Sequence, residues 1–387
     1  MAHDASPQQR TPWQRLLAAG APPRLVGFDI ARGLAVIGMV AAHVAEPALD
    51  FDWGDAATWP DIVNGRSAIL FALLAGVSIA LMTGRTQRPT EEQMPAVRLR
   101  LLGRGITIFI IGLLLEQLGT SVLIILTLYG ILYVVALPFV RARRRTLVFW
   151  SVGLALLGPT LLALVQVLTL EPYASGLALV LQGSYSLPVW VSLMLAGLAI
   201  GRSDLKRSIT AATVLGVGLV LAAVGYGAGA AYDAREATPP WEQSTPQYPD
   251  LTDNTWEHYT EAIVASGVQE RVLDALLSSN PHSGGTAELV GSGGFAMVLV
   301  ALLLLTGRWL RWPLLPVTAV GAMPLTAYSA QIVAIFVLGG PGGYVEDNAV
   351  FWWLTGALLA SCTLWIACFG RGPLERLAKW VGDRMAG

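Results

Sequence analysis

The stretch "FDIARGLAVIGMVAAHVAE", residues 28–46, is long and apolar enough to cross a membrane as a helix, yet it carries ionisable side chains near both ends. Asp29 and Arg32 lie close to its beginning, and His43 lies close to its end. An ionisable group inside a bilayer costs about 3 kcal/mol or more, and such groups usually face a cavity or a pathway. The stretch therefore predicts a membrane helix with a functional polar face.

Arg32 and His43 are eleven residues apart. A helix rises about 1.5 Å and turns about 100° per residue, so the two side chains point within about 20° of each other and lie about 16 Å apart along the axis. One helix face then connects the two sides of the membrane. A simpler interpretation stays open, in which Arg32 pairs with Asp29 and reaches the lipid headgroups while His43 lies at the opposite interface.

The composition indicates a polytopic membrane protein. Of 387 residues, 54% are hydrophobic and 13% are charged, whereas soluble domains have about 25% charged residues. We expect an all-α fold with about ten transmembrane helices in one bundle, because backbone groups in lipid need hydrogen-bond partners within the segment. The expected helices cover residues 25–46, 65–84, 101–119, 121–140, 146–168, 185–201, 208–231, 287–307, 315–339 and 349–370.

Loop charges set the expected orientation. Arginines gather in loops expected inside, such as residues 141–145, and acids gather in loops expected outside, such as residues 46–61. Because basic residues favour the cytoplasmic side, this alternation places both termini in the cytoplasm.

Three regions follow from these spans. Residues 1–24 are polar and basic without an apolar core, which indicates a cytoplasmic tail rather than a signal peptide. Residues 25–370 form the membrane domain, and residues 371–387 form a second cytoplasmic tail. The long outer loop, residues 232–286, is expected to contain one surface helix over residues 256–278.

Several function classes find no support in the sequence. It contains no nucleotide-phosphate loop with a lysine, no G-x-S-x-G turn and no zinc-ligand spacing. The two cysteines, Cys362 and Cys368, have no redox or metal-binding spacing. No basic patch lies on a soluble domain, so we expect neither a metal nor a nucleic acid as partner.

Five stretches carry a family resemblance. "FDIARGLAVIGMVAAH" resembles the opening of the transmembrane acyltransferase superfamily, in which an arginine, ten residues and a histidine mark the first helix. Other stretches are similar to the YeiB-like and heparan-alpha-glucosaminide N-acetyltransferase-like branch, and they follow in the family's order over most of the chain. They are "NGRSAILFALLAGVSIALMTGR" from Asn64, "NPHSGGTAELVGSGG" from Asn280, "AVGAMPLTAYSAQIV" from Ala319 and "GRGPLERL" from Gly370.

The resemblance implies a multi-pass acyltransferase of the bacterial plasma membrane. Such an enzyme takes an acyl group, in the first place an acetyl group, from acetyl-CoA or another acyl-CoA in the cytoplasm. It passes this group to an oxygen or nitrogen of a sugar, glycan or lipid-linked acceptor on the outer side. Membrane lipids are further partners, and a homodimer is left open.

The donor-binding and catalytic residues follow from this scheme. Arginine suits the donor's phosphates because its guanidinium donates two parallel hydrogen bonds. His43 is the expected general base, and a covalent acyl-histidine is equally open. The residues expected to bind the donor are Asp29, Arg32, Arg104 and Tyr129.

His282 is the second catalytic candidate. Pro281, Gly284 and Gly285 favour a turn around it, and Thr286 is the expected N-cap of the next helix. The N–H groups at a helix start favour an anion, so this turn is expected to stabilise an oxyanion or to hold an acidic acceptor.

Polar residues at the outer face and within apolar runs are expected to bind the acceptor. Thr326, Tyr328 and Gln331 interrupt an apolar run, where they line a tunnel or form interhelical hydrogen bonds worth about 0.6 kcal/mol each. The full substrate-binding set is Asn64, Arg66, Ser283, Thr326, Tyr328 and Gln331.

Two other functions compete with the enzyme. A lipid or small-molecule transporter or flippase uses helices broken by Gly or Pro in matching halves, and the two halves of this chain show no matching pattern. A non-catalytic membrane partner that holds a lipid predicts that neither His43 nor Arg32 matters beyond stability.

Overall fold

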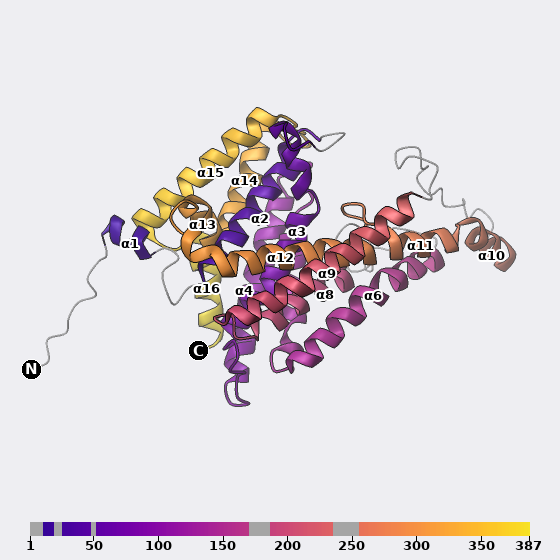
Figure 1. Cartoon of the computed structure of the whole chain (residues 1–387), viewed down its shortest axis with the longest axis horizontal. Coiled ribbons are helices and arrows are strands. Elements are labelled where there is room, and N and C mark those ends of the chain that lie inside the picture. The colour runs from indigo at the N-terminus through magenta and orange to yellow at the C-terminus, as the bar shows by residue number, and fades with distance from the viewer. Residues whose placement is uncertain (1–10, 19–24, 48–51, 170–185, 235–254) are drawn as a thin grey trace, which may run out of the picture. The chain divides into compact units, whose positions relative to one another are not determined.

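A computed structural model describes residues 11–18, 25–47, 52–169, 186–234 and 255–387. Within these ranges all regular elements are helices, and none is a strand (Figure 1). Most of the expected N-terminal tail and the part of the outer loop from 235 to 254 lie outside the described residues. The expectation of an all-α chain is confirmed for the part that is described.

Five described helices are long and apolar enough to cross a membrane. They are α2 (Val26–Val44), α6 (Arg144–Thr169), α9 (Ser208–Asp233), α12 (Thr286–Leu310) and α15 (Asn348–Phe369). A sixth span results if the bent pair α13 (Leu315–Ala322) and α14 (Pro324–Gly339) counts as one. The chain is therefore a multi-pass membrane protein, whereas the total of ten spans and the side of both termini stay predictions.

The other helices are shorter or more polar. Three short apolar helices are α3 (Arg66–Met82), α5 (Leu126–Val135) and α8 (Leu187–Gly201). The others are α1 (Pro12–Ala18), η1 (Ala56–Val63), α4 (Met94–Glu116), η2 (Leu137–Phe139), α10 (Trp256–Ala265), α11 (Val268–Leu277) and α16 (Pro373–Met385).

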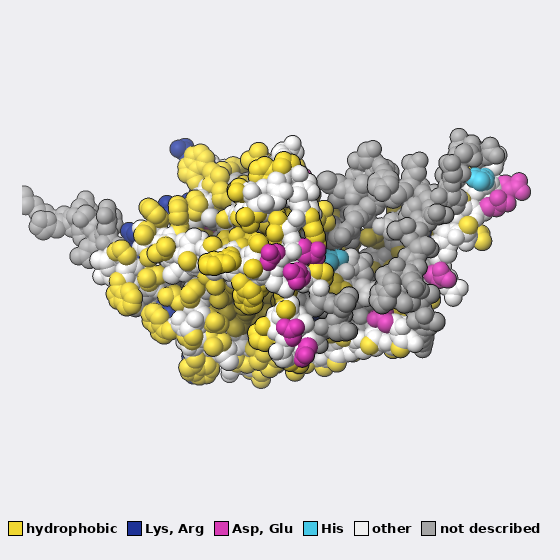
Figure 2. Space-filling view, turned by 90° about the horizontal axis from the view of Figure 1, so that it is seen from above, with side chains coloured by type: hydrophobic (Ala, Val, Ile, Leu, Met, Phe, Trp, Pro, Cys, Tyr) yellow, Lys and Arg dark blue, Asp and Glu magenta, His cyan; other side chains and the backbone are white. Residues whose placement is uncertain are grey.

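Large apolar side chains remain exposed on the long helices. Phe149 of α6 is 71% exposed and Trp353 of α15 is 81% exposed. Figure 2 shows hydrophobic side chains over much of the described surface of one face, with Asp and Glu confined to small groups. Such apolar surface is unfavourable in water and is typical of helices that face lipid.

The chain divides into two compact units, which are described separately. Unit 1 consists of residues 1–67, 95–130 and 300–387, and unit 2 consists of residues 68–94 and 131–299. The single membrane domain expected over residues 25–370 stays a prediction.

In unit 1, α2 packs against α13, α14, α15 and η1. Glycines bring α2 and α13 into backbone contact: a Cβ at Gly33 would collide with the carbonyl of Val317, and one at Gly321 would collide with the carbonyl of Asp29. Small residues let membrane helices approach this closely. The contact holds the beginning of α2, with Asp29 and Arg32, against α13.

The helix expected over residues 315–339 is instead two helices, which meet at an angle of 92°. Met323, at the break, has φ −136° and ψ 55°, outside the helical region. Pro324 follows it, and proline both lacks an N–H and disfavours a helical residue before it. Glu375 of α16 then caps α14, because its Oε1 accepts from the N–H groups of Leu325 and Thr326 at 2.8 and 3.1 Å.

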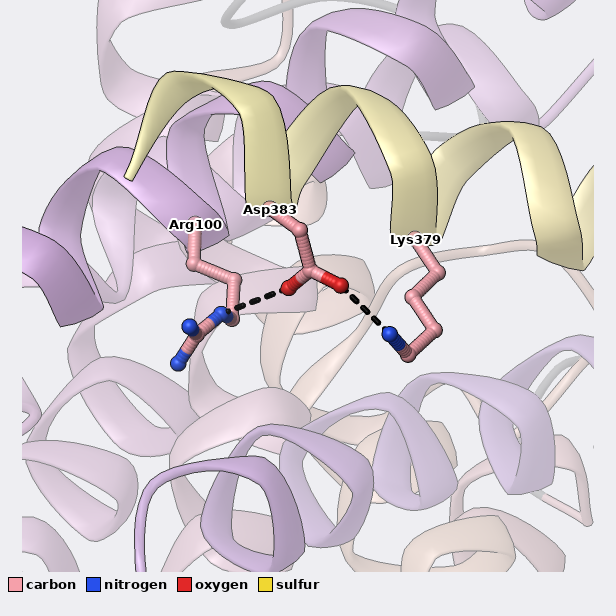
Figure 3. Close-up of polar contacts among 3 residues, drawn as sticks. All are labelled: Arg100, Lys379 and Asp383. Carbon is pink, nitrogen blue, oxygen red and sulfur yellow. Dashed lines mark hydrogen bonds and ion pairs between the residues drawn. The ribbon is translucent and has the colours of Figure 1, made fainter. Parts of the chain in front are cut away.

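The helix α16 is also fastened to α4. The carboxylate of Asp383 lies between Arg100 and Lys379 and accepts a hydrogen bond from each (Figure 3), with 2.9 Å to Nε of Arg100. The hydrogen bond from Lys379, followed by that from Arg100, lowers the pKa of Asp383. Gly103 of α4 and Gly382 of α16 lie in contact beside this group. The C-terminal segment is thus an integral part of unit 1.

In unit 2, α8 packs on α6, and α11 contacts both α6 and α9. The single surface helix expected over residues 256–278 is wrong, because the structure has two helices there, α10 and α11. Gly267 stands between them with φ +66°, a left-handed conformation that glycine adopts without strain and that interrupts a helix.

A buried arginine joins three segments of unit 2. Arg202 follows α8 and donates hydrogen bonds to Oγ1 and the carbonyl of Thr83 and to the carbonyls of Arg85 and Val140, at 2.6–2.9 Å. These carbonyls follow α3 and η2, where helix ends carry partial negative charge. Burial, with a smaller contribution from Arg88, lowers the pKa of Arg202 to about 10, so the side chain stays charged at neutral pH.

We predict that Arg202→Met lowers the free energy of unfolding by about 2–4 kcal/mol, because it leaves several buried acceptors without donors. The thermal-unfolding midpoint of the chain purified in detergent measures this loss. Arg88→Gln is the matched control: Arg88 is exposed and repels Arg202, so its removal is expected to leave the midpoint unchanged or higher. Equal midpoints for Arg202→Met and the unmodified chain would contradict the assigned role.

Candidate functional site

The helix α2 carries the central candidates without a break from Val26 to Val44. Asp29 is buried, with 3% exposed, and its Oδ1 accepts a hydrogen bond from Nη1 of Arg32 at 2.8 Å. His43 is half-buried near the other end of the helix. The ion pair between Asp29 and Arg32 offsets two charges that would be costly inside a membrane.

The face that Arg32 and His43 share is turned into the protein. The continuous helix keeps the eleven-residue register, so the two side chains lie on one face about 16 Å apart along the axis. Val36 and Met39 stand on this face between them and are both buried. The stripe from Arg32 to His43 is therefore covered along its length rather than exposed to lipid.

The other expected donor-binding residues, Arg104 and Tyr129, also lie in unit 1. Arg104 is half-buried on α4, and its Cγ lies next to Gly382 of α16. Tyr129 is buried on α5. Arg104 thus lies in the part of unit 1 where α16 is fastened, one helical turn beyond Arg100.

Asn64 and Arg66 form the turn between η1 and α3. Gly65 between them has φ +68°, and the N–H of Arg66 donates to the carbonyl of Asn64 at 2.7 Å. The guanidinium of Arg66 folds back and donates to the carbonyl of Ile62 at 2.7 Å. This hydrogen bond supports the turn and uses one of the five N–H donors of the guanidinium.

The three polar residues of α14 have different surroundings. The hydroxyl of Thr326 donates to Oε2 of Glu375 at 2.6 Å and belongs to the cap of this helix. The hydroxyl of Tyr328 accepts from the N–H of Ile125 at 3.3 Å, where α5 begins. Gln331 is fully buried, and neither of its side-chain amide atoms has a hydrogen-bond partner among the described residues.

The turn at His282 binds a carboxylate of its own chain. Glu288 of α12 is buried and accepts hydrogen bonds from the N–H groups of His282 and Gly284 at 2.8 and 2.7 Å and from the hydroxyl of Ser283 at 3.1 Å. Two N–H groups near the start of α12 therefore already hold an anion. Neighbouring protein atoms partly desolvate the exposed imidazole of His282 and lower its pKa below the usual value, which favours the neutral form at pH 7.

Two residues matter that the sequence did not single out. Glu288 and Glu375 both satisfy backbone N–H groups near the start of a membrane helix, and both occur within stretches quoted above for their resemblance. A buried glutamate within reach of a helix start is a general signal for such a cap. Thr286, the expected N-cap of α12, instead donates its hydroxyl to the carbonyl of Ala155 in α6 at 3.0 Å.

The candidates are divided between the two units. Unit 1 contains the residues of α2, α4, α5 and α14 together with Asn64 and Arg66, whereas unit 2 contains His282 and Ser283. Among the described residues, no group of three or more His, Cys, Asp or Glu side chains is arranged to hold a metal ion.

Two family models match the chain, one over each half. A family model described as "Heparan-alpha-glucosaminide N-acetyltransferase, catalytic" matches residues 24–226, slightly more than half of the chain. A second one, described as "Protein of unknown function (DUF418)", matches residues 265–383. No curated protein matches the chain. The first match includes all of α2, and the second includes the His282 turn, α14 and Glu375.

We predict that Glu288→Ala loosens the turn around His282, because three donors lose their acceptor. Hydrogen–deuterium exchange of the backbone amides of His282 and Gly284 is expected to accelerate at least about tenfold, the factor that 1.4 kcal/mol of lost stabilisation produces. Glu270→Ala, which removes an exposed carboxylate from α11, is the control and leaves these amides unchanged. Unchanged exchange in Glu288→Ala would show that the carboxylate does not hold the turn.

Proposed function

The chain belongs to the heparan-alpha-glucosaminide N-acetyltransferase-like family, and from this premise we propose that it moves an acyl group, in the first place acetyl, from cytoplasmic acyl-CoA to an acceptor on the outer side of the membrane. The family makes the chain a membrane acyltransferase. We further propose the acyl donor, the direction of transfer, the acceptor class and the residues that act.

One observation carries it: a single unbroken helix presents Arg32 and His43 on one buried face. Arg32, held by Asp29, provides a planar cation at the cytoplasmic end. His43 provides an imidazole at the outer end. Ionisable side chains within a membrane span are otherwise rare and usually line a pathway. Two of them on one buried face therefore favour a path along α2 between the two sides of the membrane.

The donor phosphates bind at the cytoplasmic end of this face. Arginine forms charge-assisted, bidentate hydrogen bonds with phosphate, so Arg32 and Arg104 are the phosphate-binding residues in the proposal, and Tyr129 contacts the same end of the donor. The pantetheine arm then extends along α2 over the separation of about 16 Å towards His43. The thioester reaches the outer half of unit 1 without the nucleotide crossing the membrane.

The chemical step takes place at His43. An acceptor hydroxyl or amine attacks the thioester carbonyl, and its proton passes to the imidazole. The new C–O or C–N bond forms while the C–S bond breaks, and the thiolate of CoA leaves and takes up a proton. In a variant of this scheme the imidazole itself attacks and an acyl-His43 transfers the group to the acceptor.

The acceptor is a sugar, a glycan or a lipid-linked molecule of the envelope of a bacterial cell. Asn64 and Arg66, in the turn before and at the start of α3, are the first group proposed to contact it, and Arg66 suits an acidic group. His282 and Ser283, in the turn held by Glu288, are the second group proposed to contact it. Surrounding lipids and a second copy of the chain are its other proposed partners.

A transporter or flippase is the second candidate function. The 92° bend between α13 and α14 favours it, because transporters use broken helices to form binding sites within the membrane. In that case acyl-CoA is neither bound nor consumed, so an assay of acyl-CoA turnover separates the two functions.

We predict that His43→Ala lowers the rate of CoA release from acetyl-CoA by about 100- to 10,000-fold, the usual contribution of a general base. The assay detects free thiol with the chain in nanodiscs, and mass spectrometry of the intact chain detects an acyl-histidine. His258→Ala, on α10, is the matched control and is expected to keep full activity. Arg32→Ala is expected to raise the KM for acyl-CoA more than it lowers kcat.

Full activity in His43→Ala would remove His43 from the mechanism. No release of CoA by the unmodified chain with any envelope glycan or lipid fraction, together with movement of a labelled lipid between leaflets, would favour the flippase.

A further inference from the structure

Gln331 in the middle of α14 has a surrounding that the packing of unit 1 does not account for. Its side chain has no exposed surface, and its amide nitrogen and oxygen both lack a partner among the described residues. Buried polar atoms in native proteins are nearly always hydrogen-bonded, and an exception calls for an explanation. The neighbouring interior positions of α14 are mostly apolar, whereas the amide of Gln331 brings two N–H donors and an acceptor oxygen.

The hydroxyls of Ser329 and Thr355 are also buried without a partner among the described residues, but they differ from Gln331 in one respect. A serine or threonine hydroxyl can rotate towards the carbonyl four residues earlier in its own helix, as Thr107 and Thr83 do in this chain. The amide of Gln331 needs both acceptors for its N–H groups and a donor for its oxygen, and a helix offers its own side chains only free carbonyl acceptors. Of these three side chains, only that of Gln331 therefore requires a partner from outside its own helix.

The position of Gln331 relates it to the proposed path of the donor. Tyr328, Gln331 and Ile335 follow one another at helical spacing and share a face of α14. Ile335 packs in one cluster with Val40 and Val44 of α2. Gln331 lies one turn before Ile335, about 6 Å towards the beginning of α14.

The helices α14 and α2 run in the same direction. Gly321, three residues before α14, touches Asp29 near the beginning of α2. Beyond the end of α14, the N–H of Asp347 donates to the carbonyl of Val44 at the end of α2, at 2.8 Å. The amide of Gln331 therefore lies at the depth of the part of α2 between Arg32 and His43.

The chemistry of this position selects the kind of ligand. An uncharged carboxamide in an apolar interior is best satisfied by an uncharged ligand whose N–H groups and carbonyls lie close together, as they do in a chain of two secondary amides. A charged ligand group is disfavoured there because the neutral amide of Gln331 cannot compensate a buried charge. The pantetheine arm of an acyl-CoA is an uncharged chain with two secondary amides between the nucleotide and the thioester.

We propose that Gln331 binds an amide of the donor's pantetheine arm and so holds the arm at mid-membrane between Arg32 and His43. This inference rests on the proposed function. Gln331 accepts through Oε1 from the N–H of one amide of the arm and donates through Nε2 to the carbonyl of the neighbouring amide, because the N–H and carbonyl of a single trans amide point in opposite directions. It is a positioning residue that takes no part in the exchange of bonds at the thioester.

The test compares Gln331→Met with Ser329→Ala in the full chain reconstituted in nanodiscs. Ser329 is two residues from Gln331 and so points to the opposite side of α14, which makes it the matched control. Binding is measured for acetyl-CoA, for acetyl-pantetheine, which keeps the arm and lacks the nucleotide, and for adenosine 3′,5′-bisphosphate, which lacks the arm. The thermal-unfolding midpoint without ligand is measured for each variant.

Gln331→Met is expected to weaken acetyl-CoA and acetyl-pantetheine by the same factor of about ten, the effect of one lost hydrogen-bonded pair. Binding of adenosine 3′,5′-bisphosphate is expected to stay unchanged. The midpoint without ligand is expected to stay equal or rise, because methionine fills the space without unpaired polar atoms. Ser329→Ala is expected to bind all three ligands like the unmodified chain.

Unchanged affinity of Gln331→Met for acetyl-pantetheine would overturn the inference and leave the proposed function intact. A lower midpoint without ligand would also overturn it, since Gln331 would then hold a water or a structural contact. Failure of the unmodified chain to bind any of the three ligands would instead contradict the proposed donor itself, and the inference with it.

Discussion

A polar group that enters a membrane must find its partner inside the protein, and this constraint explains the polar contacts that join segments within each of the two units. Arg202 reaches carbonyls after two other helices, Glu375 caps α14, and Glu288 holds the turn before α12. Each of these contacts either joins segments that are distant in the sequence or stabilises the turn before a helix. They fix the ends of the helices, and the helix ends in turn fix the apolar faces between them.

The same constraint gives α2 its place in unit 1. Gly33 and Gly321 let α2 and α13 touch through their backbones, and the carboxylate of Asp29 compensates Arg32 within the first turns. This ion pair lies within α2 and would form even if the face with Arg32 and His43 were turned towards lipid. The buried Val36 and Met39 show that this face instead belongs to the interior. The acyl-transfer scheme depends on that orientation.

The sequence predicts the helices much better than it predicts their interruptions. Apolar runs with charged ends located α2, α9 and α15 within two residues at each end. The break at Met323 was visible only as a proline, since a proline can kink a helix slightly or turn it by 92° depending on what caps the new start. That cap is Glu375, about fifty residues further along the chain, and no local pattern reveals such a partner. Gly267 separates α10 from α11 through its left-handed φ. A single glycine in a polar stretch does not by itself predict such a conformation.

For the candidate site, helical spacing was sufficient to place Arg32 and His43 on one face, because the helix between them is regular. It was not sufficient for Thr326, whose hydroxyl is engaged by Glu375, or for the turn at His282, whose donors are engaged by Glu288. The acyl-transfer scheme along α2 is tested most directly by an electron cryo-microscopy map of the chain with a non-hydrolysable acetyl-CoA analogue. The account predicts phosphate density at Arg32, with the sulfur-bearing end of the analogue beside His43. Density for the analogue away from α2, or side chains of Arg32 and His43 directed into lipid, would contradict it.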